Sequence, residues 1–279
     1  MCSIRHAVTQ ESHIEIQLAS PDGSQRNESR YGRCLLEHLT SLANLESRDL
    51  NSQGLCKHAL LHRTNSDLVT LTPAKASNTS SLPIAHSIIC PAMMHPEDTD
   101  GSKKLKYAAA VVIENPDGAI LITKRAASMK SFPDTWVIPG GHIELHETWK
   151  EAVQREIQEE VGLNDLHDLK TLGLWESVFP PIWNQEPPLR QHLVIYCSAK
   201  TSSNVIHPNE EEIAEYVWLT PLQAIALVSH QDSTKQVEII SVKESTCQRV
   251  PLSQIRGSLK QRSGTTQGTR FALSRHFQI

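Results

Sequence analysis

The sequence lacks the long apolar run of roughly 18 residues or more that a membrane-spanning helix requires. Its first twenty residues, MCSIRHAVTQESHIEIQLAS, also lack the apolar core of a secretory signal peptide. We therefore expect no membrane partner and a cytoplasmic location, in a reducing compartment.

A strong charge imbalance is absent as well. The formal net charge is −4 over 279 residues, and hydrophobic residues make up 39%, which is ordinary for a globular protein. A long basic surface for a nucleic-acid backbone is therefore not expected over the whole chain. Charge is uneven locally, because residues 245–279 contain six Lys or Arg and no acid. This stretch is either a solvated face or a basic wall that holds a polyanionic substrate.

Closely spaced cysteines are missing too. The sequence has six scattered cysteines: Cys2, Cys34, Cys56, Cys90, Cys197 and Cys247. Zinc ligands usually come in C-x-x-C pairs, so this spacing predicts reduced thiols rather than a structural zinc site. We expect Cys197 to lie in a buried strand.

The chain divides into three regions that differ in composition and in hydrophobic pattern. Residues 1–100 contain one helix-like segment, YGRCLLEHLTSLANL, and are otherwise rich in Ser, Thr and Asn, so their fold is left open. Residues 101–232 alternate strand and helix patterns throughout, which predicts an α+β domain, a mixed sheet with helices packed against it. Residues 233–279 form a C-terminal basic extension that we expect to pack on this domain.

Carboxylates are crowded into residues 141–163, GHIELHETWKEAVQREIQEEVGL. At roughly 100° per residue, Glu156, Glu159 and Glu160 fall on one face of the predicted helix. Like charges at this spacing cost a free helix roughly 0.2–0.5 kcal/mol per pair, and they lie near the helix end where the dipole disfavours anions.

Hard divalent cations neutralise such a cluster, so we expect Mg²⁺ or Mn²⁺ as cofactor and a phosphate ester or anhydride as substrate. The glycine pair before the helix allows a sharp turn, and the carbonyl of Gly141 can face the same ion. Glu147 either pairs with Arg155 and pins the loop to the helix, or is a weakly stabilising acid near the helix start.

The pattern Gly141, five residues, Glu147, seven residues and then REIQEEVGL resembles the Nudix box in every position. The resemblance implies a Nudix α/β/α sandwich and metal-dependent hydrolysis of a nucleoside diphosphate linked to another moiety. It implies metal ligation by Gly141, Glu156, Glu159 and Glu160, catalysis by these glutamates, and an orienting role for Arg155 and Glu147. A later acid is also expected, for which we favour Glu212 over Glu210 and Glu211; the alternative for this run is a solvated loop.

The flanking stretches LGLWESVFPPIWNQEPPLRQHLVIYC, HPNEEEI and GTRFAL resemble a Nudix subfamily associated with the methylguanosine cap of RNA. That resemblance implies a nucleotide-type substrate, with capped RNA as the specific expectation. Trp183, Phe179 and Trp175 are candidates for binding the methylated base, which is cationic and stacks well on aromatic rings. For Trp175 the alternative is a core residue. Two alternatives stay open: a small-molecule diphosphatase for nucleotide-sugar, CoA or dinucleotide substrates, and a nucleotide-binding module without catalysis.

Overall fold

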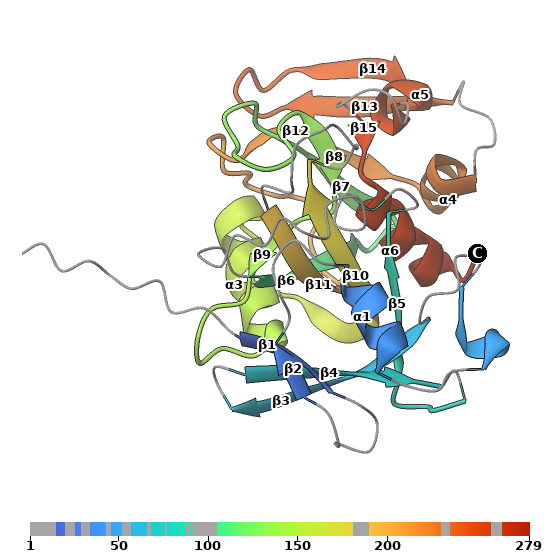
Figure 1. Ribbon diagram of the computed structural model, residues 1–279. Helices are drawn as coiled ribbons and strands as arrows, with labels where there is room; N and C mark the ends of the chain where they lie inside the picture. The colour runs from blue at the N-terminus through green and yellow to red at the C-terminus, as the bar shows by residue number, and fades with distance from the viewer. Residues whose placement is uncertain are drawn as a thin grey trace, which may run out of the picture.

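The structure is a computed structural model (Figure 1). It describes residues 15–19, 26–28, 34–42, 46–51, 57–65, 68–75, 77–87, 90, 105–180, 190–229, 235–257 and 264–279. Trp183 is not among these residues. Among the described residues, no helix has both the length and the apolarity needed to cross a bilayer.

The elements before residue 100 are mostly strands. They are β1 (Glu15–Ala19), β2 (Arg26–Glu28), α1 (Leu35–Ser41), a 3₁₀ turn (Ser47–Asp49), β3 (His58–Asn65), β4 (Leu68–Ala74) and β5 (Leu82–His86). The region has more strand than its Ser-, Thr- and Asn-rich composition suggested. The expected helix is present as α1, whose buried Leu35, Leu36 and Leu39 follow helical spacing.

The middle of the chain alternates strands and helices as predicted. Its elements are β6 (Lys106–Glu114), β7 (Ile120–Arg125), β8 (Thr135–Val137), β9 (Gly140–His142), α3 (Trp149–Val161), β10 (His167–Phe179), β11 (Arg190–Lys200), β12 (Ile213–Leu219) and α4 (Pro221–Ser229). Strands β7 and β6 pair antiparallel, whereas β6 and β11 pair parallel, with Ala109 opposite Ile195. The sheet is therefore mixed, and the predicted α+β fold is confirmed.

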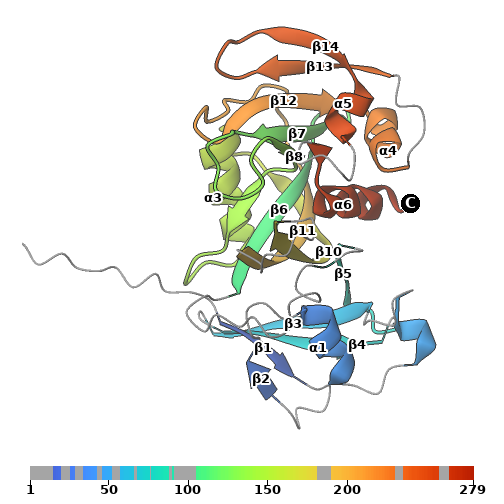
Figure 2. The same cartoon turned by 45° about the horizontal axis from the view of Figure 1, so that its top comes forward.

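Helices cover both faces of this sheet, because the central strands bury side chains on both sides. Helix α3 packs Val153 and Ile157 into one core, together with Val111 and Ile113 of β6. The intervening Val112 points into the second core, on the opposite face. Helices α4, α5 (Leu252–Arg256) and α6 (Gln267–Phe277) close that second core. Figure 2 shows α3 on one side of the strands and α4 to α6 on the other.

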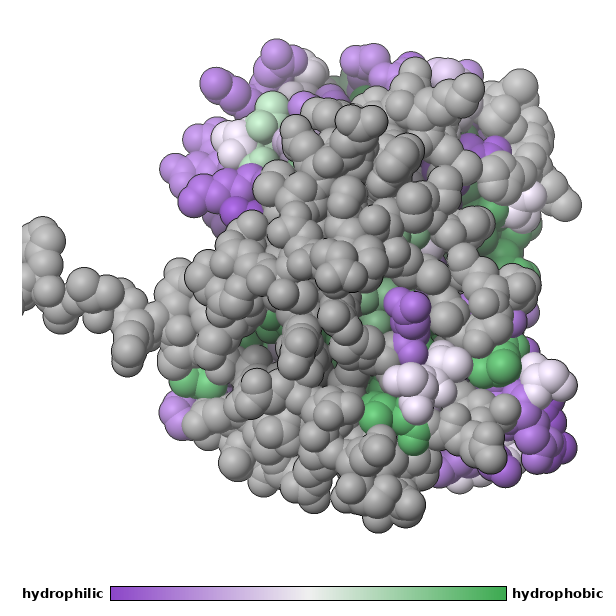
Figure 3. Space-filling view, in the orientation of Figure 1, coloured by the Kyte–Doolittle hydropathy of each residue, from purple (hydrophilic) through white to green (hydrophobic). Residues whose placement is uncertain are grey.

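The C-terminal residues extend the same sheet. Strands β13 (Gln236–Ser241) and β14 (Cys247–Pro251) form an antiparallel pair, and β13 also pairs with β12. The short β15 (Gly264–Thr265) runs parallel to β8 and leads directly into α6. In Figure 3, hydrophilic side chains gather over the end of the molecule where β13 and β14 lie.

Strand β5 joins the N-terminal strands to the rest of the molecule. It pairs antiparallel with β3 and parallel with β10, where Ile84 lies opposite Leu174. The first strands thus continue the central sheet, and Figure 2 shows them as a layer beyond β10. The boundaries expected from sequence, near residues 100 and 232, stay predictions.

Candidate active site

Helix α3 carries four of the predicted residues, Arg155, Glu156, Glu159 and Glu160, and local sequence fixes where it begins and ends. Thr148 and Glu151 form a reciprocal capping box at its start. Gly162 ends it in the left-handed conformation, at φ 72°, as the sequence predicted. Between these caps, Glu160 is buried at 6% exposure, whereas the side chain of Glu159 is 59% exposed. Glu156 and Glu160 therefore face the cavity described below, and Glu159 lies towards solvent.

The glycine pair lies directly against these carboxylates. Gly140 has a φ of 147°, and its N–H donates to Oε2 of Glu160 at 3.0 Å. A side chain at Gly141 would collide with the carboxyl group of Glu156. Glycine is thus required at Gly140 by its backbone conformation and by the nearby Ala109 carbonyl, whereas a side chain at Gly141 would force the flexible Glu156 carboxylate to move.

Arg155 holds the loop and the helix together. Its Nε and Nη2 donate to the two carboxylate oxygens of Glu147, at 3.1 and 2.7 Å. The predicted pair of Glu147 and Arg155 is therefore present, as a bidentate contact. Nη1 also donates to Glu156 at 3.0 Å and to Glu159 at 3.2 Å.

Two further charged residues approach the helix carboxylates. Arg125, at the end of β7, lines the same cavity and donates from Nε to the carbonyl of Ser131 at 3.0 Å. Burial lowers the pKa of Arg125, while the charges of Glu160, Glu212 and Glu156 oppose that shift. Arg125 was not singled out by sequence, since an arginine ending a strand carries no motif.

Glu212 also lines the cavity, whereas Glu210 and Glu211 are exposed and do not. The carbonyl of Glu212 accepts from the N–H of Ala126 at 2.8 Å, which ties this loop to the end of β7. The preference for Glu212 over its neighbours agrees with this placement. Its role as a ligand stays a prediction.

Burial is the main influence on the pKa values of Glu156 and Glu160, the two glutamates that face the cavity. It raises the pKa of Glu160 to about 8, although the Gly140 N–H and Arg125 act in the opposite direction. Burial likewise raises the pKa of Glu156, against the effect of Arg155. The arginines beside these two carboxylates therefore offset the effect of burial only in part.

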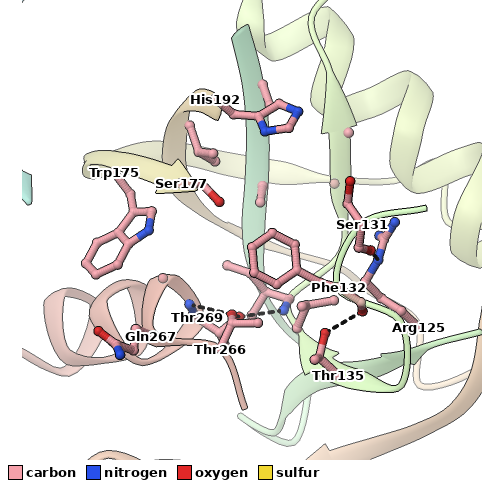
Figure 4. A pocket seen from close by; sticks show the side chains of 18 of the residues that line it. Arg125, Ser131, Phe132, Thr135, Trp175, Ser177, His192, Thr266, Gln267 and Thr269 are labelled. Atoms are coloured by element: carbon pink, nitrogen blue, oxygen red, sulfur yellow. Dashed lines mark hydrogen bonds between the residues drawn. The ribbon is translucent and has the colours of Figure 1, made fainter. Parts of the chain in front are cut away.

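The cavity has a volume of about 660 Å³. Figure 4 shows its wall made from the loop after β7, strands β10 and β11, and the start of α6. Labelled side chains from each of these segments surround one space, including Phe132, Trp175, His192 and Thr266. A volume of this size is typical of a small-molecule or cofactor site.

The predicted aromatic residues differ in their placement. Trp175 lines the cavity but is 8% exposed and packs against Phe271 at a ring distance of 5.3 Å. Phe179 packs edge-on against Phe132, at 5.1 Å, and does not itself line the cavity. Phe132 does line it, and sequence reasoning missed this residue because it stands in an irregular loop. Trp183 lies outside the described residues.

The C-terminal segment contributes two arginines to the same wall. Arg256 is 8% exposed, and Arg270 donates from Nη2 to the Arg256 carbonyl at 2.6 Å. Burial lowers the pKa of Arg270, and the charge of Arg256 adds to that effect. Among the described residues, Nη2 of Arg256 and Nε of Arg270 are buried without a hydrogen-bond acceptor. Two guanidinium groups so placed favour an anion in the cavity.

Comparison with known proteins agrees with the resemblance seen in the sequence. Residues 104–240 match the NUDIX domain. The m7GpppN-mRNA hydrolase NUDT17 of Danio rerio is 38% identical over 144 residues, which are 48% of this chain and 48% of that protein. Its counterpart from Homo sapiens is 36% identical, over 45% of this chain and 41% of that protein. The chain thus matches about half the length of these curated relatives.

A second group of relatives carries another name. An isopentenyl-diphosphate Delta-isomerase from Kocuria rhizophila is 29% identical over 44% of this chain and 67% of that protein. Among solved structures, a MutT NUDIX hydrolase from Burkholderia pseudomallei aligns over 62% of this chain and 98% of its own, at 18% identity and a TM-score of 0.40. Through its residues 104–240, this chain belongs to the NUDIX domain family.

Proposed function

We propose that this protein is a metal-dependent Nudix hydrolase that cleaves a diphosphate linkage in a nucleoside diphosphate derivative. As its substrate we propose the methylguanosine cap of RNA, with release of methylated GDP. The observation that carries the proposal is a single cavity lined by the carboxylates of Glu156, Glu160 and Glu212 and by the buried Arg256 and the half-buried Arg270. A metal–diphosphate pair is complementary to both kinds of group.

The donor set fits Mg²⁺ or Mn²⁺, because it consists of hard oxygens. Burial raises the pKa values of Glu160 and Glu156, and a bound cation would offset that effect. Glu156, Glu160 and Glu212 would hold the ion with the Gly141 carbonyl, and Glu159 would join from the rim. When bound, the ion neutralises phosphate charge and makes a water molecule more acidic.

The chain's own residues have separate tasks in this proposal. Arg155 fixes the Glu156 carboxylate, and Glu147 in turn fixes Arg155. One of the helix glutamates accepts the proton of the attacking water. Arg256 and Arg270 bind phosphate oxygens of the substrate and supply positive charge as the bridging oxygen departs.

The choice of capped RNA rests on the names of the relatives and on the aromatic lining. The relatives with 33–38% identity are named m7GpppN-mRNA hydrolases. Phe132 and Trp175 line the cavity and offer ring faces or edges to a cationic methylated guanine. A cytoplasmic location, expected from the sequence, suits this substrate.

Product identification by mass spectrometry tests the proposal. Purified protein is incubated with capped RNA, CoA, ADP-ribose and NADH, each with Mg²⁺ or Mn²⁺, beside a Glu160→Gln control. Methylated GDP formed only by the intact protein supports the cap assignment. Cleavage of a small dinucleotide or of CoA instead supports the small-molecule alternative. Binding of these ligands without any product supports the non-catalytic alternative.

The arginine wall has its own test. Arg270→Ala should raise KM for the substrate about tenfold or more, because a buried charged hydrogen bond to phosphate is worth roughly 1.5–3 kcal/mol. Arg275→Ala is the matched control, since Arg275 is on the same helix but exposed. Equal KM values for the two variants would remove Arg270 from substrate binding.

A further inference from the structure

Four side chains that can bind a metal meet away from the Nudix box. They are Cys34, His86, Cys90 and Glu176, and one ligand atom of each lies within 4.8 Å of those of the other three. All four residues are buried, with at most 7% exposure. Three come from the N-terminal region, before α1 and at or after the end of β5, and Glu176 comes from β10.

The spacing is that of ligands around one ion. Donor atoms at about 2.0–2.3 Å from a tetrahedral zinc ion are separated from one another by roughly 3.3–3.8 Å. The observed upper limit of 4.8 Å therefore requires only a small contraction of side chains. Two sulfurs, one imidazole and one carboxylate complete a closed set of four donors.

His86 is oriented as a metal ligand usually is. Its Nδ1 lies in hydrogen-bond contact with the carbonyl oxygen of Ser87. A carbonyl only accepts, so Nδ1 carries a proton, and in the neutral form of the ring the lone pair then lies on Nε2. Nε2 is buried and has no hydrogen-bond partner among the described residues. A backbone carbonyl on the other ring nitrogen is the arrangement that fixes metal-ligating histidines.

Glu176 is held in the same way. Its Oε1 accepts from the N–H of Leu35 at 3.0 Å and from Nε2 of Gln191 at 2.7 Å. Its Oε2 faces Sγ of Cys34 at 3.4 Å. Because two donors occupy Oε1, Oε2 is the oxygen directed at the cluster and available to an ion.

The cluster is costly when no ion is bound, because its four donors are buried together and the buried Nε2 of His86 has no hydrogen-bond partner among the described residues.

We propose that Cys34, His86, Cys90 and Glu176 bind one Zn²⁺ that fastens the N-terminal region to strand β10 of the NUDIX domain. Thiolate and imidazole donors select zinc over Mg²⁺ or Mn²⁺, which prefer sets made of oxygen alone. The full set of four protein ligands and their burial make the site structural. Glu176 and Cys90 also line the active-site cavity, so the ion supports one of its walls. The proposal does not depend on the substrate.

Metal analysis of the full chain tests it. Protein expressed with zinc in the medium is dialysed against excess Mg²⁺ and a weak chelator, and zinc is then measured by mass spectrometry. We expect one zinc ion per chain, lost in Cys34→Ser and Cys90→Ser and retained in Cys247→Ser, whose cysteine is exposed. Zinc that is absent from the native chain, or equal in all variants, overturns the proposal.

A second measurement uses the native chain alone, so it does not depend on whether the variants fold. The native chain is stripped of metal, reduced and titrated with Co²⁺. Thiolate-to-cobalt charge transfer together with tetrahedral d–d absorption supports the site. Octahedral absorption without charge transfer overturns it, since the ion is then held by oxygens alone. A disulfide between Cys34 and Cys90 in protein purified under reducing conditions also overturns it.

Discussion

Arg155 and Glu147 form the contact that attaches the glycine loop to helix α3, and its strength can be measured. Two nitrogens of Arg155 meet two oxygens of Glu147, at 3.1 and 2.7 Å. Their side chains are 28% and 16% exposed, so the pair is only partly hydrated. Removing either partner leaves the other charge with fewer contacts in a half-buried position.

The expected magnitude follows from this geometry. With charge centres at about 4 Å and an effective dielectric constant of about 20, the attraction is roughly 4 kcal/mol. Dehydration of both groups offsets part of it, which leaves a coupling of about 2 kcal/mol. That exceeds the roughly 0.2–1 kcal/mol of solvent-exposed ion pairs.

A double-mutant cycle with Arg155→Met and Glu147→Gln measures the coupling by urea unfolding in metal-free buffer. The exposed pair of Arg249 and Glu238 is the control, because Nε and Nη2 of Arg249 likewise donate to one carboxylate, both to Oε1, at 2.8 and 2.7 Å. We expect a clearly larger coupling for Arg155 and Glu147 than for the control pair. Equal couplings would refute the reasoning that partial burial of this pair stabilises the loop.

The same cycle has a predicted pH dependence. Burial acts to raise the pKa of Glu147, but hydrogen bonds from Arg155 and the Glu144 N–H outweigh it, and the pKa lies below its ordinary value of 4.5. A lowered folded-state pKa gives stabilisation that is present above the unfolded value and lost as pH falls through the folded one. The coupling should therefore be unchanged between pH 7 and pH 5 and decline only below about pH 4.5.

Three further predictions concern catalysis, metal binding and RNA binding. Glu160→Gln should lower kcat at least about a hundredfold while urea unfolding shows an intact fold, because the buried carboxylate is replaced by an isosteric neutral amide; a folded variant with normal turnover contradicts its assigned role. Gly141→Ala should weaken Mg²⁺ binding, measured by calorimetry, because its methyl group displaces the Glu156 carboxylate; unchanged affinity would place the ion elsewhere. KM for a long capped RNA should rise more steeply with ionic strength than KM for a cap dinucleotide, because the basic C-terminal region meets additional phosphates; parallel salt dependences would exclude that region from RNA binding.

The candidate site was predictable where its parts lie on one helix. Spacing converts directly into geometry there, so Glu156 and Glu160 could be assigned to one face and Glu147 to Arg155 from sequence. Gly162 was predictable because a helix end requires a left-handed residue. The separation of Glu159 from the other two glutamates was not, since it depends on which part of that face the sheet covers.

The cavity wall was less predictable, because it is assembled from distant segments. Phe132 comes from an irregular loop, and Arg125 ends an ordinary strand. Arg256 and Arg270 stand in a tail whose composition indicated only a basic stretch. The N-terminal strands were missed for a related reason. Strand β5 is held in place by pairing with β10, and the residues of neither strand indicate which residues of the other they pair with.

The cysteines show the limit of spacing rules most directly. A C-x-x-C pair is informative because a short turn brings both sulfurs to one ion, whatever the rest of the fold does. Cys34 and Cys90 instead meet because α1 packs beside β5, and β5 in turn places His86 next to Glu176 of β10. Each ligand looks ordinary in its own segment. Only the burial of all four, and the unpaired Nε2 of His86, distinguish them from reduced core thiols and their neighbours. A metal site formed in this way also stabilises the tertiary contacts that create it, so its loss should loosen the N-terminal strands before it affects α3.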